Sequence, residues 1–114
     1  RINLLSASHA NGSLNVTGSK LQMALPANLS NLPPTFTLGI RPEDVQLAAD
    51  GAFTGEITLI EPLGVETILH IKNGEQTLLS IVSGMTHHRL GEQVHFNVVR
   101  ERLHYFDANG TRID

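Results

Sequence analysis

The chain has 114 residues, a length that supports one hydrophobic core and predicts a single domain over residues 1–114. Its formal net charge is −3, from 8 basic and 11 acidic residues, so no cationic excess is available for a phosphate backbone and nucleic acid is not an expected partner. The chain has no cysteine, which excludes disulfides, thiolate metal sites and a cysteine nucleophile.

Most of the chain has the two-residue periodicity of β-strands. The clearest case is the segment 35–40, which places Phe36, Leu38 and Ile40 on one face. Strands are expected at residues 14–16, 21–25, 35–40, 56–60, 67–71, 77–82 and 94–98. No convincing helix longer than a turn or two interrupts them.

Four pairs in the sequence are typical of tight hairpin turns, because asparagine, aspartate and glycine accept positive φ. They are Asn11-Gly12, Asp50-Gly51, Asn73-Gly74 and Asn109-Gly110. Residues 26–34 contain turn formers without periodicity and are expected to form an internal loop. Short strands and frequent turns predict an all-β domain, either a small closed barrel or a sandwich.

The sequence contains no recognisable catalytic or cofactor-binding motif. No glycine-rich loop ends in Gly-Lys-Ser or Gly-Lys-Thr, and no nucleophile elbow surrounds a serine. Six histidines are present, but their spacing does not bring a ligand set to one point, and the adjacent His87 and His88 face opposite ways on an extended chain. We therefore expect no catalytic residue, metal or cofactor site within this chain.

The segment from residue 39 to residue 45 ends the clearest strand with a turn that carries opposite charges. Pro42 disfavours helical backbone at Arg41, and its own fixed φ suits the first position of a turn. Glu43 and Asp44 are expected to accept hydrogen bonds from the exposed amides of this turn. The sequence predicts a strand end fixed by proline.

Arg41 is a candidate ion-pair residue in addition to its place in the turn. Its planar guanidinium suits a carboxylate from a neighbouring loop or subunit. The expected partners are Glu61 and Glu66, which flank the turn around Gly64.

The C-terminal segment predicts a hairpin in which residues 111–113 return along residues 103–106. Tyr105 and Phe106 are adjacent, so one of them faces away from the core. That outward aromatic side chain is a candidate for an interface.

Four segments, in this order, resemble the C-terminal regulatory domain of ATP-binding subunits of bacterial ABC importers for sugars and sn-glycerol-3-phosphate. Residues 2–5 resemble the segment that leaves the ATPase domain, and residues 39–43 resemble the Gly-Ile-Arg-Pro-Glu motif. Residues 63–67 resemble the Leu-Gly-x-Glu-Thr turn, and Phe106-Asp107 with Gly110 resembles the closing Phe-Asp-x-x-Gly element. The chain begins with Arg1 rather than methionine, so we expect it to be a piece of a longer polypeptide.

The resemblance implies a small OB-fold-like β-barrel without the ATPase domain, so that ATP and Mg²⁺ would bind outside this chain. It further implies a homodimer formed through this domain, membrane subunits and a regulatory protein as partners, and a peripheral position on the cytoplasmic face of the bacterial inner membrane. The residues expected to have interface or structural roles are Arg41, Pro42, Glu43, Gly64, Glu66, Phe106 and Asp107. Phe106 matches a position near the dimer contact, whereas Arg41 and Glu43 match architectural positions.

Two other functions remain open from the sequence. The first is a small oxyanion-binding barrel of the molybdate type, for which Arg41, Lys72, Arg89, Arg100 and Arg102 are the available cations. The second is single-stranded nucleic-acid binding, which the negative charge and the scarcity of aromatic residues disfavour.

Overall fold

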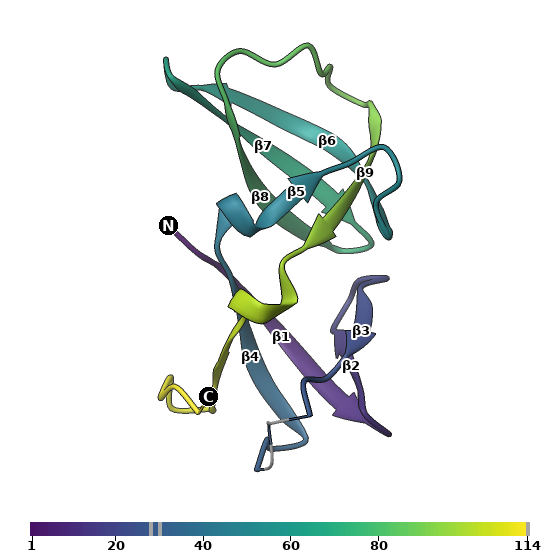
Figure 1. The fold of residues 1–114 in the computed structure, drawn as a ribbon, viewed down its shortest axis with the longest axis vertical. Helices are drawn as coiled ribbons and strands as arrows, with labels where there is room; N and C mark the ends of the chain where they lie inside the picture. The colour runs from purple at the N-terminus through teal and green to yellow at the C-terminus, as the bar shows by residue number, and fades with distance from the viewer. Residues whose placement is uncertain (28, 30, 114) are drawn as a thin grey trace.

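A computed structural model describes residues 1–27, 29 and 31–113 of the chain (Figure 1). These residues form two antiparallel five-stranded sheets. The first sheet has the order β10-β4-β1-β2-β3 and contains β1 (Asn3–Ala10), β2 (Ser13–Val16), β3 (Gln22–Ala24), β4 (Thr35–Ile40) and β10 (His104–Phe106). The second sheet has the order β5-β9-β6-β7-β8 and contains β5 (Val45–Leu47), β6 (Phe53–Pro62), β7 (Glu66–Asn73), β8 (Gln76–Ser83) and β9 (Gln93–Val98).

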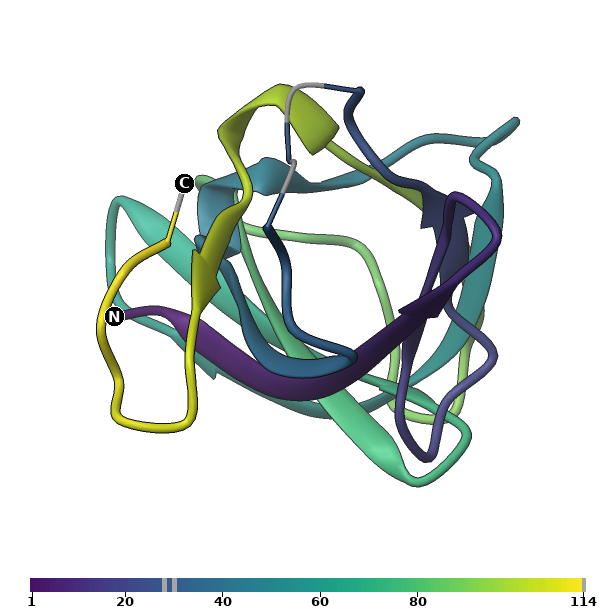
Figure 2. The same ribbon diagram turned by 90° about the horizontal axis from the view of Figure 1, so that it is seen from below.

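The sheets follow one another along the long axis of a molecule that measures 42 × 23 × 22 Å (Figure 1). Seen along that axis, the strands surround the centre of the molecule (Figure 2). The second sheet nearly closes into a barrel, because its edge strands meet where the Ser80 hydroxyl donates a hydrogen bond of 2.5 Å to the Val45 carbonyl oxygen. The expectation of an all-β, OB-like barrel with little helix is confirmed.

The chain passes between the sheets twice, each time through a 3-10 helix of three residues. The helix η1 (Pro42–Asp44) leads from β4 to β5, and η2 (Arg100–Arg102) leads from β9 back to β10. No helix in the described part of the chain is long and apolar enough to cross a membrane.

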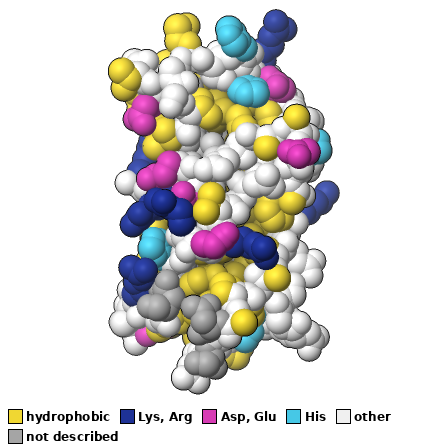
Figure 3. Space-filling model, in the orientation of Figure 1, with side chains coloured by type: hydrophobic (Ala, Val, Ile, Leu, Met, Phe, Trp, Pro, Cys, Tyr) yellow, Lys and Arg dark blue, Asp and Glu magenta, His cyan; other side chains and the backbone are white. Residues whose placement is uncertain are grey.

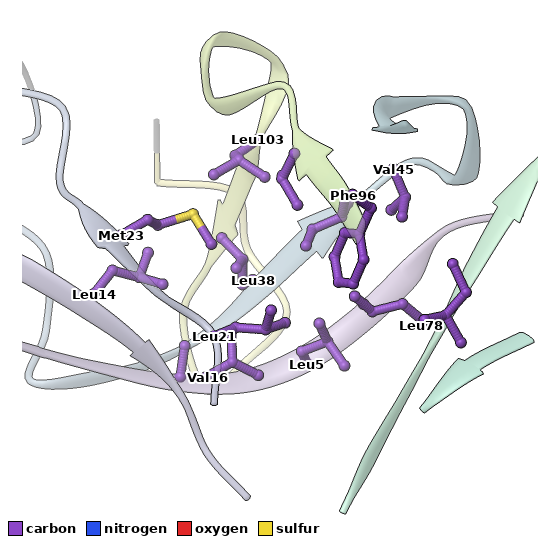
Figure 4. Packing of buried hydrophobic residues seen from close by; sticks show 14 of the residues in the cluster. Leu5, Leu14, Val16, Leu21, Met23, Leu38, Val45, Leu78, Phe96 and Leu103 are labelled. Carbon is purple, nitrogen blue, oxygen red and sulfur yellow. The ribbon is translucent and has the colours of Figure 1, made fainter. Parts of the chain in front are cut away.

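The strands predicted by alternation bury the expected faces. Phe36, Leu38 and Ile40 of β4 are all buried, and β9 buries every second residue, including Phe96. Figure 4 shows the Phe96 ring between Val45 and Leu78, directed toward the first sheet. A single hydrophobic cluster therefore contains residues of both sheets.

Two expected turns differ from the structure. The hairpin between β7 and β8 turns at Gly74 and Glu75, because Asn73 is still paired with Gln76 in the strands. Only Gly74 has positive φ there, which fits a type II′ turn with glycine first. Asp50-Gly51 does not form a hairpin at all, since β5 and β6 both pair with β9. By contrast, Asn11-Gly12 forms the expected turn between β1 and β2, with positive φ at both residues.

Polar side chains fasten the first sheet to the second. The Asn3 side chain makes two hydrogen bonds to the backbone of Leu79, which lies on the edge strand β8. The Asn73 side chain accepts a bond of 2.6 Å from the Lys20 amide and donates one of 2.7 Å to the Thr54 carbonyl oxygen. Asn73 thus ties the turn after β2 to strand β6 of the second sheet.

The segment 26–34 contains no strand or helix among its described residues, and positions 28 and 30 of the expected loop lie outside the described residues.

Candidate interaction surface

The Arg41-Pro42-Glu43-Asp44 turn is the first passage between the sheets. Arg41 is extended, with φ −69° and ψ 142°, and Pro42 is the first residue of η1, as its restricted φ favours. Pro42 and Asp44 are buried, whereas Arg41 and Glu43 are exposed. The turn is closed by a backbone hydrogen bond of 2.9 Å from the Asp44 amide to the Arg41 carbonyl oxygen.

Asp44 connects the two passages between the sheets. Its carboxylate, 6% exposed, lies 3.1 Å from the Arg102 Nε in η2, and its carbonyl oxygen accepts a hydrogen bond of 3.0 Å from the Val99 amide. The expectation that Asp44 would accept bonds from amides of its own turn is wrong, because its carboxylate is directed to the guanidinium of η2 instead. A buried carboxylate requires such a partner.

The expected pairing of Arg41 with Glu61 or Glu66 is not formed within this chain. Glu61 instead lies 2.5 Å from the Nε2 of His70 across β6 and β7, and Glu66 is exposed without a side-chain ion pair among the described residues. The hydrogen bond from His70 holds the pKa of Glu61 below its ordinary value of 4.5. A pairing of Arg41 with a carboxylate of another subunit stays a prediction.

The turn around Gly64 joins β6 to β7 at the far end of the second sheet (Figure 1). Gly64 has φ +94°, and the turn is closed by a bond of 2.7 Å from the Leu63 amide to the Glu66 carbonyl oxygen. The Gly84 amide bonds to the Val65 carbonyl oxygen at 2.7 Å, which attaches this turn to the loop after β8. Gly64 and the Glu66 carbonyl oxygen therefore both take part in the backbone geometry of this turn.

Phe106 is the outward aromatic residue, because Tyr105 is only 3% exposed and belongs to the core. Its ring lies over Gly39 in the neighbouring strand β4, so closely that a Cβ at Gly39 would lie 2.9 Å from the Phe106 Cε2. A glycine inside a strand often marks such a close approach. The ring is also 6.4 Å from that of His104, measured between centroids.

A mostly apolar surface surrounds this ring on the outer face of the first sheet. Leu4, Gly39 and His104 stand opposite one another across β1, β4 and β10. Ile2 reaches the same glycine from the other side. We name Ile2, Leu4, Gly39, His104 and Phe106 the outer patch; in it Leu4 is 59% exposed and Ile2 is 37% exposed.

Asp107, next to the outer patch, organises the terminal turn. Its Oδ1 accepts hydrogen bonds of 2.9 Å from the amides of Asn109 and Thr111. Its own amide donates to the Thr111 carbonyl oxygen, and Phe106 forms a bridge with Arg112. The expected terminal hairpin is present, and Asp107 shapes it.

The predicted site residues do not form one centre. They lie at the passage between the sheets, at the far turn of the second sheet and at the end of β10. In residues 1–27, 29 and 31–113, no three His, Asp or Glu side chains gather in a way that could hold a metal ion. The sequence reasoning missed Arg102 as the partner of Asp44, and no local motif indicates a pair 58 residues apart.

Comparison with known proteins places the chain in a family. Residues 38–106 match the TOBE domain. An alpha-glucoside transport ATP-binding protein of Rhizobium meliloti is 31% identical over 97 residues, which cover 82% of this chain and 27% of that protein.

An sn-glycerol-3-phosphate import ATP-binding protein of Agrobacterium fabrum is 40% identical over 90 residues, covering 72% of this chain and 26% of its own length. A protein of the same description from Vibrio vulnificus is 34% identical over 119 residues, which cover 98% of this chain and 31% of that protein. The chain thus spans about a quarter to a third of the length of these curated relatives. Since the family match covers more than half of the chain and includes both passages between the sheets, this chain belongs to the TOBE domain family.

Proposed function

We propose that this chain is the C-terminal regulatory domain of the ATP-binding subunit of a bacterial ABC importer for sugars or sn-glycerol-3-phosphate. The observation that carries the proposal is the similarity over most of the chain to proteins described as ATP-binding components of such importers. The parent chain would bind and hydrolyse ATP with Mg²⁺ in a separate domain. It would work beside membrane subunits on the cytoplasmic face of the inner membrane.

The proposed role of the domain is to hold two ATP-binding subunits together and to receive a regulatory protein. The outer patch supports the dimer part of this role, because Leu4 leaves 59% of its surface and Ile2 leaves 37% of its surface in solvent on a sheet face. A second copy of the same patch would remove this apolar surface from water, which is favourable. Phe106 would lie at the centre of the contact, over the strand glycine that positions its ring.

Sedimentation velocity over a range of concentrations tests the dimer. We compare the unmodified chain with Leu4→Thr, which retains strand propensity but removes an exposed apolar side chain. Burial of the exposed part of Leu4 corresponds to about 1–2 kcal/mol in each protomer, about 2–4 kcal/mol in the dimer, so the dissociation constant should rise about 30- to 900-fold. The control is Leu90→Thr, since Leu90 is 66% exposed in the loop between β8 and β9, outside the outer patch.

The outcome that counts against the dimer is a chain that remains monomeric at millimolar concentration. Equal effects of the two substitutions would also contradict it, because they would show that association does not use the outer patch. A separate experiment tests whether the parent chain belongs to an importer. The parent subunit is expressed with and without this domain, and the uptake of sn-glycerol-3-phosphate and maltose by the cells is measured.

A further inference from the structure

A pocket of about 430 Å³ lies between the two edge strands of the first sheet, β3 and β10, which do not pair with each other. It is lined by residues of β3 and the segment that follows it on one side, and by η2 and β10 on the other. The residues used in the argument are Leu25, Leu29, Arg100, Glu101, Leu103 and Tyr105. This volume is within the usual range for small-molecule sites.

The inner part of the pocket is apolar. Leu103 and Tyr105 are 5% and 3% exposed and belong to the hydrophobic core, so buried core side chains close the inner end of the pocket. Leu25 and Leu29 pack partly buried against the same cluster. The edges β3 and β10 of the first sheet do not pair, and the half-buried Leu25 and Leu29 are the apolar side chains that stay accessible beside this gap.

The rim of the pocket carries two opposite charges side by side. Arg100 and Glu101 are neighbours in η2 and both are exposed. Within the described ranges 1–27, 29 and 31–113, neither side chain takes part in an ion pair, whereas Arg102 of the same helix is paired with Asp44. Figure 3 shows hydrophobic surface in the lower half of the molecule, where the first sheet lies, with acidic and basic side chains next to each other above it.

We propose that this pocket binds a small zwitterion with an apolar body, of the chemical class of an apolar α-amino acid. Arg100 would hold the carboxylate, and Glu101 would hold the ammonium group. The apolar body would lie against the half-buried Leu25 and Leu29, from which it displaces water. A simple anion or a simple cation would use only one of the two charges and leave the other unpaired. This site is on neither the outer patch nor the dimer contact, so it does not depend on the proposed function.

The test is a titration of the isotopically labelled 114-residue chain with L-phenylalanine, followed by amide NMR shifts. L-phenylalanine should shift the amides of Leu25, Leu103 and Tyr105 saturably, with a dissociation constant on the order of millimolar for a ligand of this size. The probes 3-phenylpropionate and phenethylamine each lack one charge and should bind about three- to tenfold more weakly. Arg100→Gln and Glu101→Gln should each weaken the binding of L-phenylalanine by a similar factor.

Two further variants separate the pocket from general charge effects. Arg89→Gln removes an exposed arginine elsewhere and should leave the affinity unchanged. Ala24→Leu adds bulk at an exposed position of the pocket wall and should abolish the shifts while the remaining spectrum stays folded.

The proposal is overturned if L-phenylalanine gives no saturable shifts, or if shifts persist in Ala24→Leu. Equal affinity for 3-phenylpropionate would identify a site for anions instead, and equal affinity for phenethylamine a site for cations; either result refutes the zwitterion. Shifts that spread over the outer patch would show that the probe acts as a nonspecific apolar ligand.

Discussion

Asn73→Ala should be among the most destabilising single substitutions of a polar residue in this chain. Asn73 is 6% exposed, and its side chain satisfies the Lys20 amide at 2.6 Å and the Thr54 carbonyl oxygen at 2.7 Å. Each buried group that loses its partner costs about 1–3 kcal/mol, and entry of water near the exposed turn reduces that cost. We therefore expect the free energy of unfolding to fall by about 2–4 kcal/mol.

Urea unfolding, followed by circular dichroism, measures this loss. The control is Asn97→Ala, because the Asn97 side chain accepts only one hydrogen bond, from the Ala52 amide at 2.9 Å, in an exposed setting. That substitution should cost about 1 kcal/mol or less. If Asn73→Ala costs no more than Asn97→Ala, the contact between the turn after β2 and the second sheet contributes little, and the reasoning is refuted.

Two further predictions concern charged groups. Arg102→Ala leaves the buried carboxylate of Asp44 unpaired, but Arg102 itself is 55% exposed, so the free energy of unfolding measured in urea should fall by only about 1–2 kcal/mol. The control Arg100→Ala removes the same charge from η2 and should change the free energy of unfolding by less than about 0.5 kcal/mol. Because the pKa of Glu61 is lowered, ionised Glu61 stabilises the fold at pH values above the ordinary pKa of 4.5. This contribution disappears as the pH falls through the lowered pKa. Glu61→Gln should therefore lower the melting temperature at about pH 6 but not at about pH 2, and a difference that does not change with pH would contradict the assignment.

The predicted strands show either a clear alternation of buried and exposed residues or, as in β7, a run rich in β-branched and apolar residues. Strand β9 is the best example, with Phe96 buried and its neighbours exposed. Strand β1 was missed because its inward residues include the polar Asn3 and the small Ala7, which obscure the period. Asn3 is buried for a reason that lies outside its own segment, since its side chain bonds to the edge strand β8.

The candidate surface was predictable only in its local parts. The alternation of Tyr105 and Phe106 correctly indicated one outward aromatic side chain, because adjacent strand residues face opposite ways. The glycine that receives the ring belongs to another strand, and only the pairing of β4 with β10 brings the two together. The ion pair was misassigned for the same reason, since the sequence order of Arg41 and Glu61 says nothing about which charges meet in space.

The Arg41-Pro42-Glu43-Asp44 turn is best understood through the path of the chain. The chain leaves the first sheet through η1 and returns through η2, so the relative position of the sheets depends on these two short passages. Pro42 restricts the backbone φ of the first passage. Asp44 contacts the second passage twice, through its carboxylate to Arg102 and through its carbonyl oxygen to the Val99 amide. Because each helix has only three residues, neither passage has enough hydrogen bonds of its own to fix its direction. The contact between Asp44 and η2 therefore supplies a geometric constraint that the helices lack, and it gives the Arg41-Pro42-Glu43-Asp44 turn a structural part at the junction of the two sheets.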